Sequence, residues 1–387
     1  MQPILEAEIK GMGEPDKFVL VNGHVDTPFS PGVTDNVSGC AALMEIARVF
    51  NKHKERLNRS IRILFWSGHE TGAYAGSVWY NDEYWHDLRY NCVAFLGVDS
   101  PGAKGATEYS ERGVWPSPEL WGLVKESISH ATGKTCETYR WPGRSGDRSF
   151  WGTGLPSVWL CATLPEEELD PFVGFSGLGW WWHTPWATLD RADKDDLASN
   201  VKVYVDFTFA LCNAPILSMN FVDMADKMLP ILEDLQEKAD KIRAHFNIYQ
   251  VLGRVREFKK LAEDLERLNE DVIARYEGAE DKEAFEPIFE EINRCIMWTS
   301  RHLNLIACTD AGKTEQMTME HFGRFAFPGL QPMLELAELP LPYPGPVPDF
   351  MLLKTKLVRE RNNVEDGFVL AINQIKGTIN EVNKHIN

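Results

Sequence analysis

Residues 18–39 read FVLVNGHVDTPFSPGVTDNVSG, and the interpretation of the whole chain starts from them. The apolar, β-branched run at 18–21 predicts a short buried strand. It leads into His24 and Asp26, and Asp35 follows just before an apolar run typical of a helix. Histidine and carboxylate are ligands that zinc and similar metals prefer, and open α/β sheets keep their sites at strand carboxyl ends. The stretch predicts a metal site, although a core histidine followed by a helix N-cap aspartate would fit the same letters.

Composition and net charge limit the classes of partner and the cellular location that we expect for the protein. The 387 residues carry a formal net charge of -17, which argues against nucleic acid or an anionic membrane surface as a partner. Seven cysteines without a CxxC pair favour reduced thiols and a cytoplasmic location. We expect no signal peptide, and no apolar run reaches the roughly 18 residues that a membrane span needs.

The first half of the chain alternates predicted strands with predicted helices. Near-continuous apolar strands in such an order predict an α/β domain over residues 1–215, with a mostly parallel mixed sheet flanked by helices. The expected strands are 4–9, 18–21, 59–66, 92–98 and 156–162, and the main expected helices are 37–53, 77–90 and 197–212.

The second half, residues 216–387, is a different kind of sequence. Twelve of the 13 tryptophans precede residue 190, and from about residue 219 long charged segments carry single apolar stripes. Helices with one apolar face must bury it, which predicts an α-helical bundle that serves as a scaffold or a dimerisation surface. A proline-rich connector, LPLPYPGPVP, lies between the last two apolar stripes.

Further His and carboxylate residues follow the other predicted strands. A set without cysteine and with long gaps fits a hydrolytic site better than a structural zinc knot. Asp26 would hold His24 in one tautomer through the other ring nitrogen. The candidate ligands are His24, Asp35, the pair His69 and Glu70, Asp99, and His183 in GLGWWWHTPWATLD.

The order of these motifs resembles the co-catalytic zinc aminopeptidase family (clan MH). That family includes the glutamate carboxypeptidases and the transferrin-receptor ectodomain. The matching motifs are His-x-Asp, DN-x-SG, a strand that ends before G…GS, an Asp after a strand and a late His segment with Asp190. They extend over residues 4–213, so the resemblance covers the α/β half of the chain.

The resemblance implies a divalent metal cofactor, with zinc favoured and one or two ions per chain. Two ions would be bridged by Asp35. His24 and Asp99 would complete one metal site, and His183 with an acid of the pair at 69–70 would complete the other.

The chain departs from the family at that pair, where the family has Glu-Glu, a general base followed by a metal ligand. Alignment through the strand at 59–66 gives His69 the base position and Glu70 the ligand position. Alignment through GS at 76–77 instead gives Glu70 the base position and Thr71 the ligand position. The strand register is preferred because a one-residue loop insertion is easier than a strand slip. His69 can accept a proton near neutral pH, but it could equally bind metal while Glu70 acts as the base.

Two further stretches offer substrate contacts. Arg144 or Arg148 in GRSGDRSFWGTG could bind a substrate carboxylate, and a structural ion pair is the alternative. Trp181 and Trp182 could wall the site with aromatic surface, and core packing is the alternative.

Family members normally carry further helices and a strand ahead of the first strand pair. Either the numbering starts inside a larger protein, or a separate partner subunit supplies that part.

The helical half resembles the C-terminal dimerisation region of the glutamate carboxypeptidases, so we expect a homodimer through residues 219–387.

These observations predict a metal-dependent hydrolase of an amide-type bond in a small, aromatic or carboxylate-bearing substrate. Two alternatives stay open at this point. One is an exopeptidase that removes terminal residues from short peptides. The other is a non-catalytic relative used for binding, or a subunit of a hetero-oligomeric hydrolase.

Overall fold

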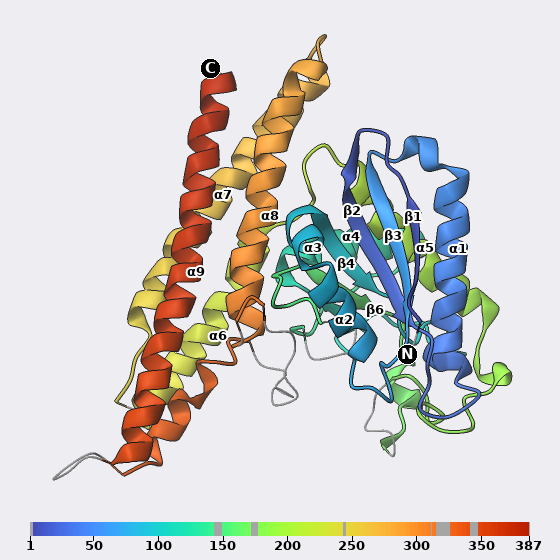
Figure 1. Cartoon of the computed structure of the whole chain (residues 1–387), viewed down its shortest axis with the longest axis horizontal. Coiled ribbons are helices and arrows are strands. Elements are labelled where there is room, and N and C mark those ends of the chain that lie inside the picture. Colours follow the sequence, from blue (N-terminus) through green and yellow to red (C-terminus); the bar gives the residue numbers. More distant parts are fainter. Residues whose placement is uncertain are drawn as a thin grey trace.

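The computed structural model describes residues 3–142, 149–171, 177–242, 245–310, 312–314, 326–340 and 347–386. An α/β part and a bundle of long helices lie side by side (Figure 1). The change from one to the other follows helix α5 (Lys194–Asn213). This architecture confirms the predicted fold class.

The described residues form a six-stranded sheet in the order β1-β3-β2-β4-β6-β5. The central pairs β3-β2, β2-β4 and β4-β6 are parallel, while the edge strands β1 and β5 run antiparallel to their neighbours. The edge strand β5 was not predicted from the sequence, because it is only a short segment that ends in a proline. Sheets tolerate a proline in an edge strand. The strands are β1 (Leu5–Ile9), β2 (Glu14–His24), β3 (Arg59–Trp66), β4 (Cys92–Gly97), β5 (Val114–Pro116) and β6 (Ser157–Leu160).

Strand β2 lies at the centre of the sheet. Its residues 18–21 are fully buried, as the apolar run predicts. Its register pairs His24 with Trp66 of β3, and Asn22 with Gly97 of β4. The three strands therefore end at nearly the same level, and the loops that follow them meet at one edge of the sheet.

The helices that accompany the sheet follow the predicted pattern with one exception. The segment expected to form one helix over 77–90 forms two, which are separated at Tyr84. Helix α1 buries Leu43, Ile46 and Phe50 on one face. The helices before α5 are α1 (Ser38–Lys52), α2 (Ala75–Glu83), α3 (Trp85–Asn91) and α4 (Trp121–Thr132).

The bundle buries its apolar stripes within the chain. Val251, Val255 and Phe258 of α7 are fully buried, and α7 packs against both α6 and α9. None of the described helices combines the length and the apolar character needed to cross a membrane. The bundle helices are α6 (Phe221–Lys241), α7 (Tyr249–Gly278), α8 (Glu286–Cys308) and α9 (Pro348–Ile386).

Helix α8 contacts the α/β part through buried polar groups (Figure 1), and α6 also packs against it, at the short turn Pro118–Leu120. The buried guanidinium of Arg301 donates to the carbonyl oxygens of Arg89 and Cys92. One turn further on, Asn304 Nδ2 donates to Oε1 of Glu119 over 2.5 Å, and both side chains are buried. Buried polar contacts, in addition to apolar packing, therefore join the two parts.

We expect Asn304→Ala to lower the free energy of unfolding by about 2 kcal/mol, because the buried Glu119 carboxyl loses its donor. Urea denaturation would measure the change. The matched control is Asn363→Ala, since Asn363 is exposed on α9 and bonds only Glu360 of its own helix among the described contacts. The control should stay within about 0.5 kcal/mol. Equal losses in the two variants would contradict the assigned role of Asn304.

Candidate metal centre

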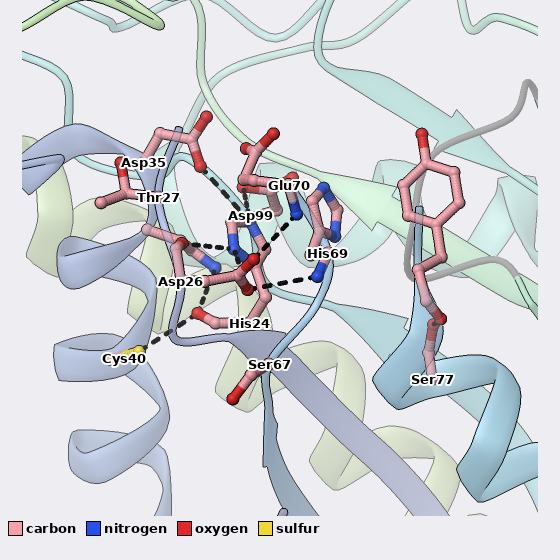
Figure 2. A network of polar contacts seen from close by, with 12 residues as sticks. His24, Asp26, Thr27, Asp35, Cys40, Ser67, His69, Glu70, Ser77 and Asp99 are labelled. Atoms are coloured by element: carbon pink, nitrogen blue, oxygen red, sulfur yellow. Dashed lines mark hydrogen bonds and ion pairs between the residues drawn. The ribbon is translucent and has the colours of Figure 1, made fainter. Parts of the chain in front are cut away.

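His24 ends strand β2 and is fully buried at the carboxyl edge of the sheet. Its Nδ1 lies 2.9 Å from the backbone oxygen of Asp26, which sets Nδ1 as the protonated nitrogen. The other nitrogen, Nε2, lies 3.3 Å from Asp35 Oδ1 and 3.2 Å from Asp99 Oδ1. Figure 2 shows His24 at the middle of this group. The imidazole therefore presents one nitrogen to two carboxylates.

Asp26 fixes the His24 ring in a different way from the one expected. Its carboxylate Oδ1 is 3.7 Å from His24 Nδ1, so the backbone carbonyl makes the closer contact. The carboxylate instead accepts the backbone N–H groups of His69, at 3.2 Å, and Glu70, at 2.9 Å (Figure 2). Asp26 thus ties the loop after β3 to the loop after β2, which is a positioning role.

Asp35 lies between two histidines. It sits at a kink in the short segment η1 (Val33–Val37), where its own backbone is extended, and its side chain is almost completely buried. Oδ1 faces His24, while Oδ2 lies 3.0 Å from Nε2 of His183. Burial raises the pKa of Asp35, but the hydrogen bonds with His183 and His24 outweigh it and hold this pKa well below its usual range.

His183 reaches the group from a loop far along the chain. Its φ of 56° is unusual for a residue with a Cβ, so the surrounding structure must hold it there. The backbone bond from Val33 N to Ala187 O, 2.8 Å, joins this loop to η1. His183 Nε2 also lies 3.2 Å from Glu70 Oε1. Burial lowers the pKa of His183, but bonds with Asp35 and Glu70 raise it to about 9.

These side chains form two overlapping ligand sets that share Asp35. Within each set one ligand atom per residue lies within 4.8 Å of the others. One histidine and two carboxylates in each set are the donor chemistry that zinc and related hydrolytic metals take, so these residues could hold a divalent metal. The first set is His24, Asp35 and Asp99, and the second is Asp35, Glu70 and His183.

His69 lies beside the first set. Its ring stacks on that of His24 with centroids 3.8 Å apart, and the edge of Tyr74 packs against it at 5.2 Å. A third group, His24, His69 and Glu70, also falls within 4.8 Å. Glu70 thus belongs to two of the three candidate ligand groups, and His69 belongs to one.

The sequence interpretation missed one positioning residue, Asn36. Its Nδ2 donates to Val98 O at 3.0 Å and to His24 O at 3.3 Å, and its Oδ1 accepts the N–H of Ser100 at 3.1 Å. One amide thus connects the ends of β2 and β4 next to Asp35. The only sequence signal for it was the DN dipeptide ahead of α1.

The residues predicted to contact substrate lie in different surroundings, and two of them lie outside the described residues. Trp182 donates its indole N–H to Asp35 Oδ2 over 2.9 Å, so it contacts a candidate ligand directly. Trp181 is buried with Ala103 and neighbouring apolar residues, which corresponds to core packing and not to the predicted pocket wall. Arg144 and Arg148 lie outside the described residues.

Metallopeptidases and aminopeptidases are among the proteins that this chain is similar to. An endoplasmic reticulum metallopeptidase (1-B) of Caenorhabditis elegans is 28% identical over 199 residues, which are 48% of this chain and 20% of that protein. Aminopeptidase YwaD of Bacillus subtilis is 26% identical over 193 residues, 49% of this chain and 39% of that protein. The chain thus spans less than half the length of either relative.

Among solved structures, BSAP, a zinc aminopeptidase from Bacillus subtilis, matches 53% of this chain and 48% of its own, with 22% identity and a TM-score of 0.44. The model of peptidase family M28 matches residues 5–208, which is more than half of the 387 residues. The match confirms the resemblance drawn from the motifs: the chain belongs to peptidase family M28.

Proposed function

We propose that this protein hydrolyses a peptide or amide bond with the help of one or two divalent metal ions, zinc being favoured. The observation that carries the proposal is the pair of His/carboxylate sets that share the buried Asp35. Membership of family M28 supports it. A metal ion bound there would supply Lewis acidity, which polarises a substrate carbonyl and makes water a stronger acid.

The chain's own residues would divide the remaining tasks. Glu70 points to His183 and Asp35, so we assign it as a ligand. His69 stacks at the border of the same group, and we assign it to accept and return the proton of the attacking water. Asp26 would hold the two neighbours in place through their backbone N–H groups.

Two other functions compete with an amide hydrolase of small substrates. An exopeptidase would use the same residues and differ only in the substrate terminus that it recognises. A panel of aminoacyl amides and N-acyl amides separates them, because activity confined to free-amine substrates favours an aminopeptidase. A purely binding relative is disfavoured by the joint presence of His24, Asp35, Asp99 and His183.

The homodimer, the partner subunit and the cytoplasmic location stay predictions. The apolar stripes of α6–α9 are buried inside the chain, so a dimer through residues 219–387 would use outer faces of the bundle. Light scattering of the purified chain at micromolar concentration tests the dimer. Mass spectrometry after native purification tests the partner subunit.

Zinc should bind and stabilise the metal-stripped protein. At a free zinc concentration about 100 times the Kd, we expect the free energy of unfolding to rise by about 2.7 kcal/mol. Asp35→Ala should abolish this gain because both ligand sets lose a member, whereas Asp190→Ala, at an exposed aspartate of the 3-10 turn Leu189–Arg191, should keep it. Thermal unfolding with metal analysis measures both. A native protein that holds no divalent metal and rebinds none would contradict the proposal.

Trp182→Phe should weaken zinc binding about tenfold, because Asp35 loses the donor that orients its carboxylate. Competition against a metal chelator of known affinity measures the change. Trp180→Phe is the control, since Trp180 is an exposed neighbour in the same loop. Equal affinities of the Trp182→Phe protein and the unmodified protein would show that the indole does not support the site.

The pair at 69–70 should separate metal binding from proton transfer. His69→Ala should keep its metal content and lose kcat by about 100-fold or more, as expected for removal of a general base. Glu70→Ala should lose about one equivalent of metal if each set holds one ion. His53→Ala, at an exposed histidine after α1, should change neither. Metal loss in His69→Ala with metal retained in Glu70→Ala would reverse the two assignments.

A further inference from the structure

A second site candidate lies at the opposite edge of the sheet from the metal centre. A cavity of about 330 Å³ lies between the amino ends of the central strands and helix α8. Lys17 near the start of β2, Arg59 at the start of β3 and Val93 at the start of β4 line its sheet side. This volume is at the small end of the range of natural ligand pockets.

Helix α8 closes the other side of the cavity with a single face. Its lining residues recur at intervals of three and four along the helix, so they point the same way. This face contains Glu290, Asn293, Arg294, Met297, Trp298 and Arg301.

The lining is rich in cations, although the chain as a whole carries a net charge of -17. Arg59 pairs with Glu14 at 2.8 Å, and Arg294 pairs with Glu291 of its own helix, so Glu290 is the remaining carboxylate of the lining. The cationic residues of the lining are Lys17, Arg59, Arg89, Arg294 and Arg301. Positive charge therefore exceeds negative charge around this cavity.

Two of these arginines are buried without a carboxylate partner. Within the described chain neither Arg89 nor Arg301 forms an ion pair, and both are at least nine-tenths buried. Arg89 donates to the carbonyl of Thr153 at 2.8 Å. Its guanidinium also lies over the rings of Trp85, at 5.5 Å, and Trp298, at 5.3 Å. A buried charge without a counter-ion is costly, and the cost falls when a counter-charge binds.

Arg301 keeps one donor group free for such a ligand. Its Nε donates to Arg89 O at 3.0 Å and its Nη2 to Cys92 O, whereas its buried Nη1 has no hydrogen-bond partner among the described residues. Burial lowers the pKa of Lys17 and of Arg301; Glu14 raises the pKa of Lys17, and the charge of Arg301 lowers it. The cations thus repel one another across the cavity.

We propose that this cavity binds a small divalent oxyanion, either inorganic phosphate or the phosphate group of a monoester. Guanidinium groups present forked donors that match phosphate oxygens, and Lys17 adds a point charge beside them. Trp298 and Met297 provide an apolar wall next to the cations. The bound anion would join α8 to strands β2 and β4. The site is separate from the metal centre and does not depend on the proposed hydrolysis.

The test is titration of the full chain with sodium phosphate, followed by calorimetry and thermal unfolding, with sodium chloride at equal ionic strength as reference. We expect saturable binding and a rise in Tm that chloride does not reproduce. Lys17→Gln should bind phosphate about tenfold more weakly, since it loses one charge-assisted bond. Lys10→Gln, at an exposed lysine between β1 and β2, should bind as the unmodified protein does.

A variant of the metal centre tests whether phosphate binds at the metal centre instead of in this cavity. His24→Ala should retain phosphate binding, because His24 lies at the other end of β2. Binding lost in His24→Ala but unchanged in Lys17→Gln would assign phosphate to the metal centre and overturn the proposal. The absence of saturable binding would also overturn it. Arg294→Gln, at a half-exposed residue of the lining, replaces Lys17→Gln if that protein does not fold.

Phenyl phosphate identifies the source of the phosphate group. Tighter binding than inorganic phosphate would support a monoester whose organic part contacts Trp298. Equal or weaker binding would support inorganic phosphate itself.

Discussion

The parallel pairing of β2 with β3 and β4 is the constraint on which the candidate metal centre depends. Because His24 lies opposite Trp66 and Asn22 lies opposite Gly97, the residues that follow each strand emerge at one level. His24, Glu70 and Asp99 are up to 75 residues apart in sequence, yet they meet because parallel strands share a carboxyl edge. A shift of one residue in this register would turn the side chain of His24 to the other face of the sheet.

Burial of such a group of acids and histidines costs free energy of desolvation, and neighbouring residues hold the group in place. The buried Asp35 is stabilised by two histidines and the indole of Trp182, while Asn36 joins the ends of β2 and β4. The left-handed backbone of His183 is a local cost that these contacts must offset. This balance is typical of functional sites, where local preference gives way to a required geometry.

The sequence predicted the parts of the fold that depend on periodicity. The buried run at 18–21, the helix after Asp35 and the bundle helices each follow from local pattern, and the expected sheet was confirmed. The loop residues His24, Asp35 and Asp99 could be named because they directly follow strands or open a helix. The assignment of each as a ligand stays a prediction.

Other features could not be read from the sequence because they depend on long-range contacts. The carboxylate of Asp26 bonds the loop after β3, and the indole of Trp182 meets Asp35 across 147 residues. Nothing in the local pattern distinguishes Trp181, which is buried in the core, from Trp182, which is partly buried and bonds Asp35. Edge strand β5 forms only because β6 offers it a partner, and three residues carry no periodic signal.

The helical half has a role beyond packing of its own apolar stripes. Those stripes belong to one buried apolar cluster that continues into the α/β part, yet apolar burial does not explain why a charged residue, Arg301 of α8, is buried against β4. A leucine at that position would avoid the desolvation of a charge, which favours a polar reason for the arginine. Arg301 satisfies two carbonyls of the α/β part and still has an unused donor beside Lys17 and Arg89. The strands that carry the metal ligands at one end thus meet α8 at the other, and the same sheet register positions both groups.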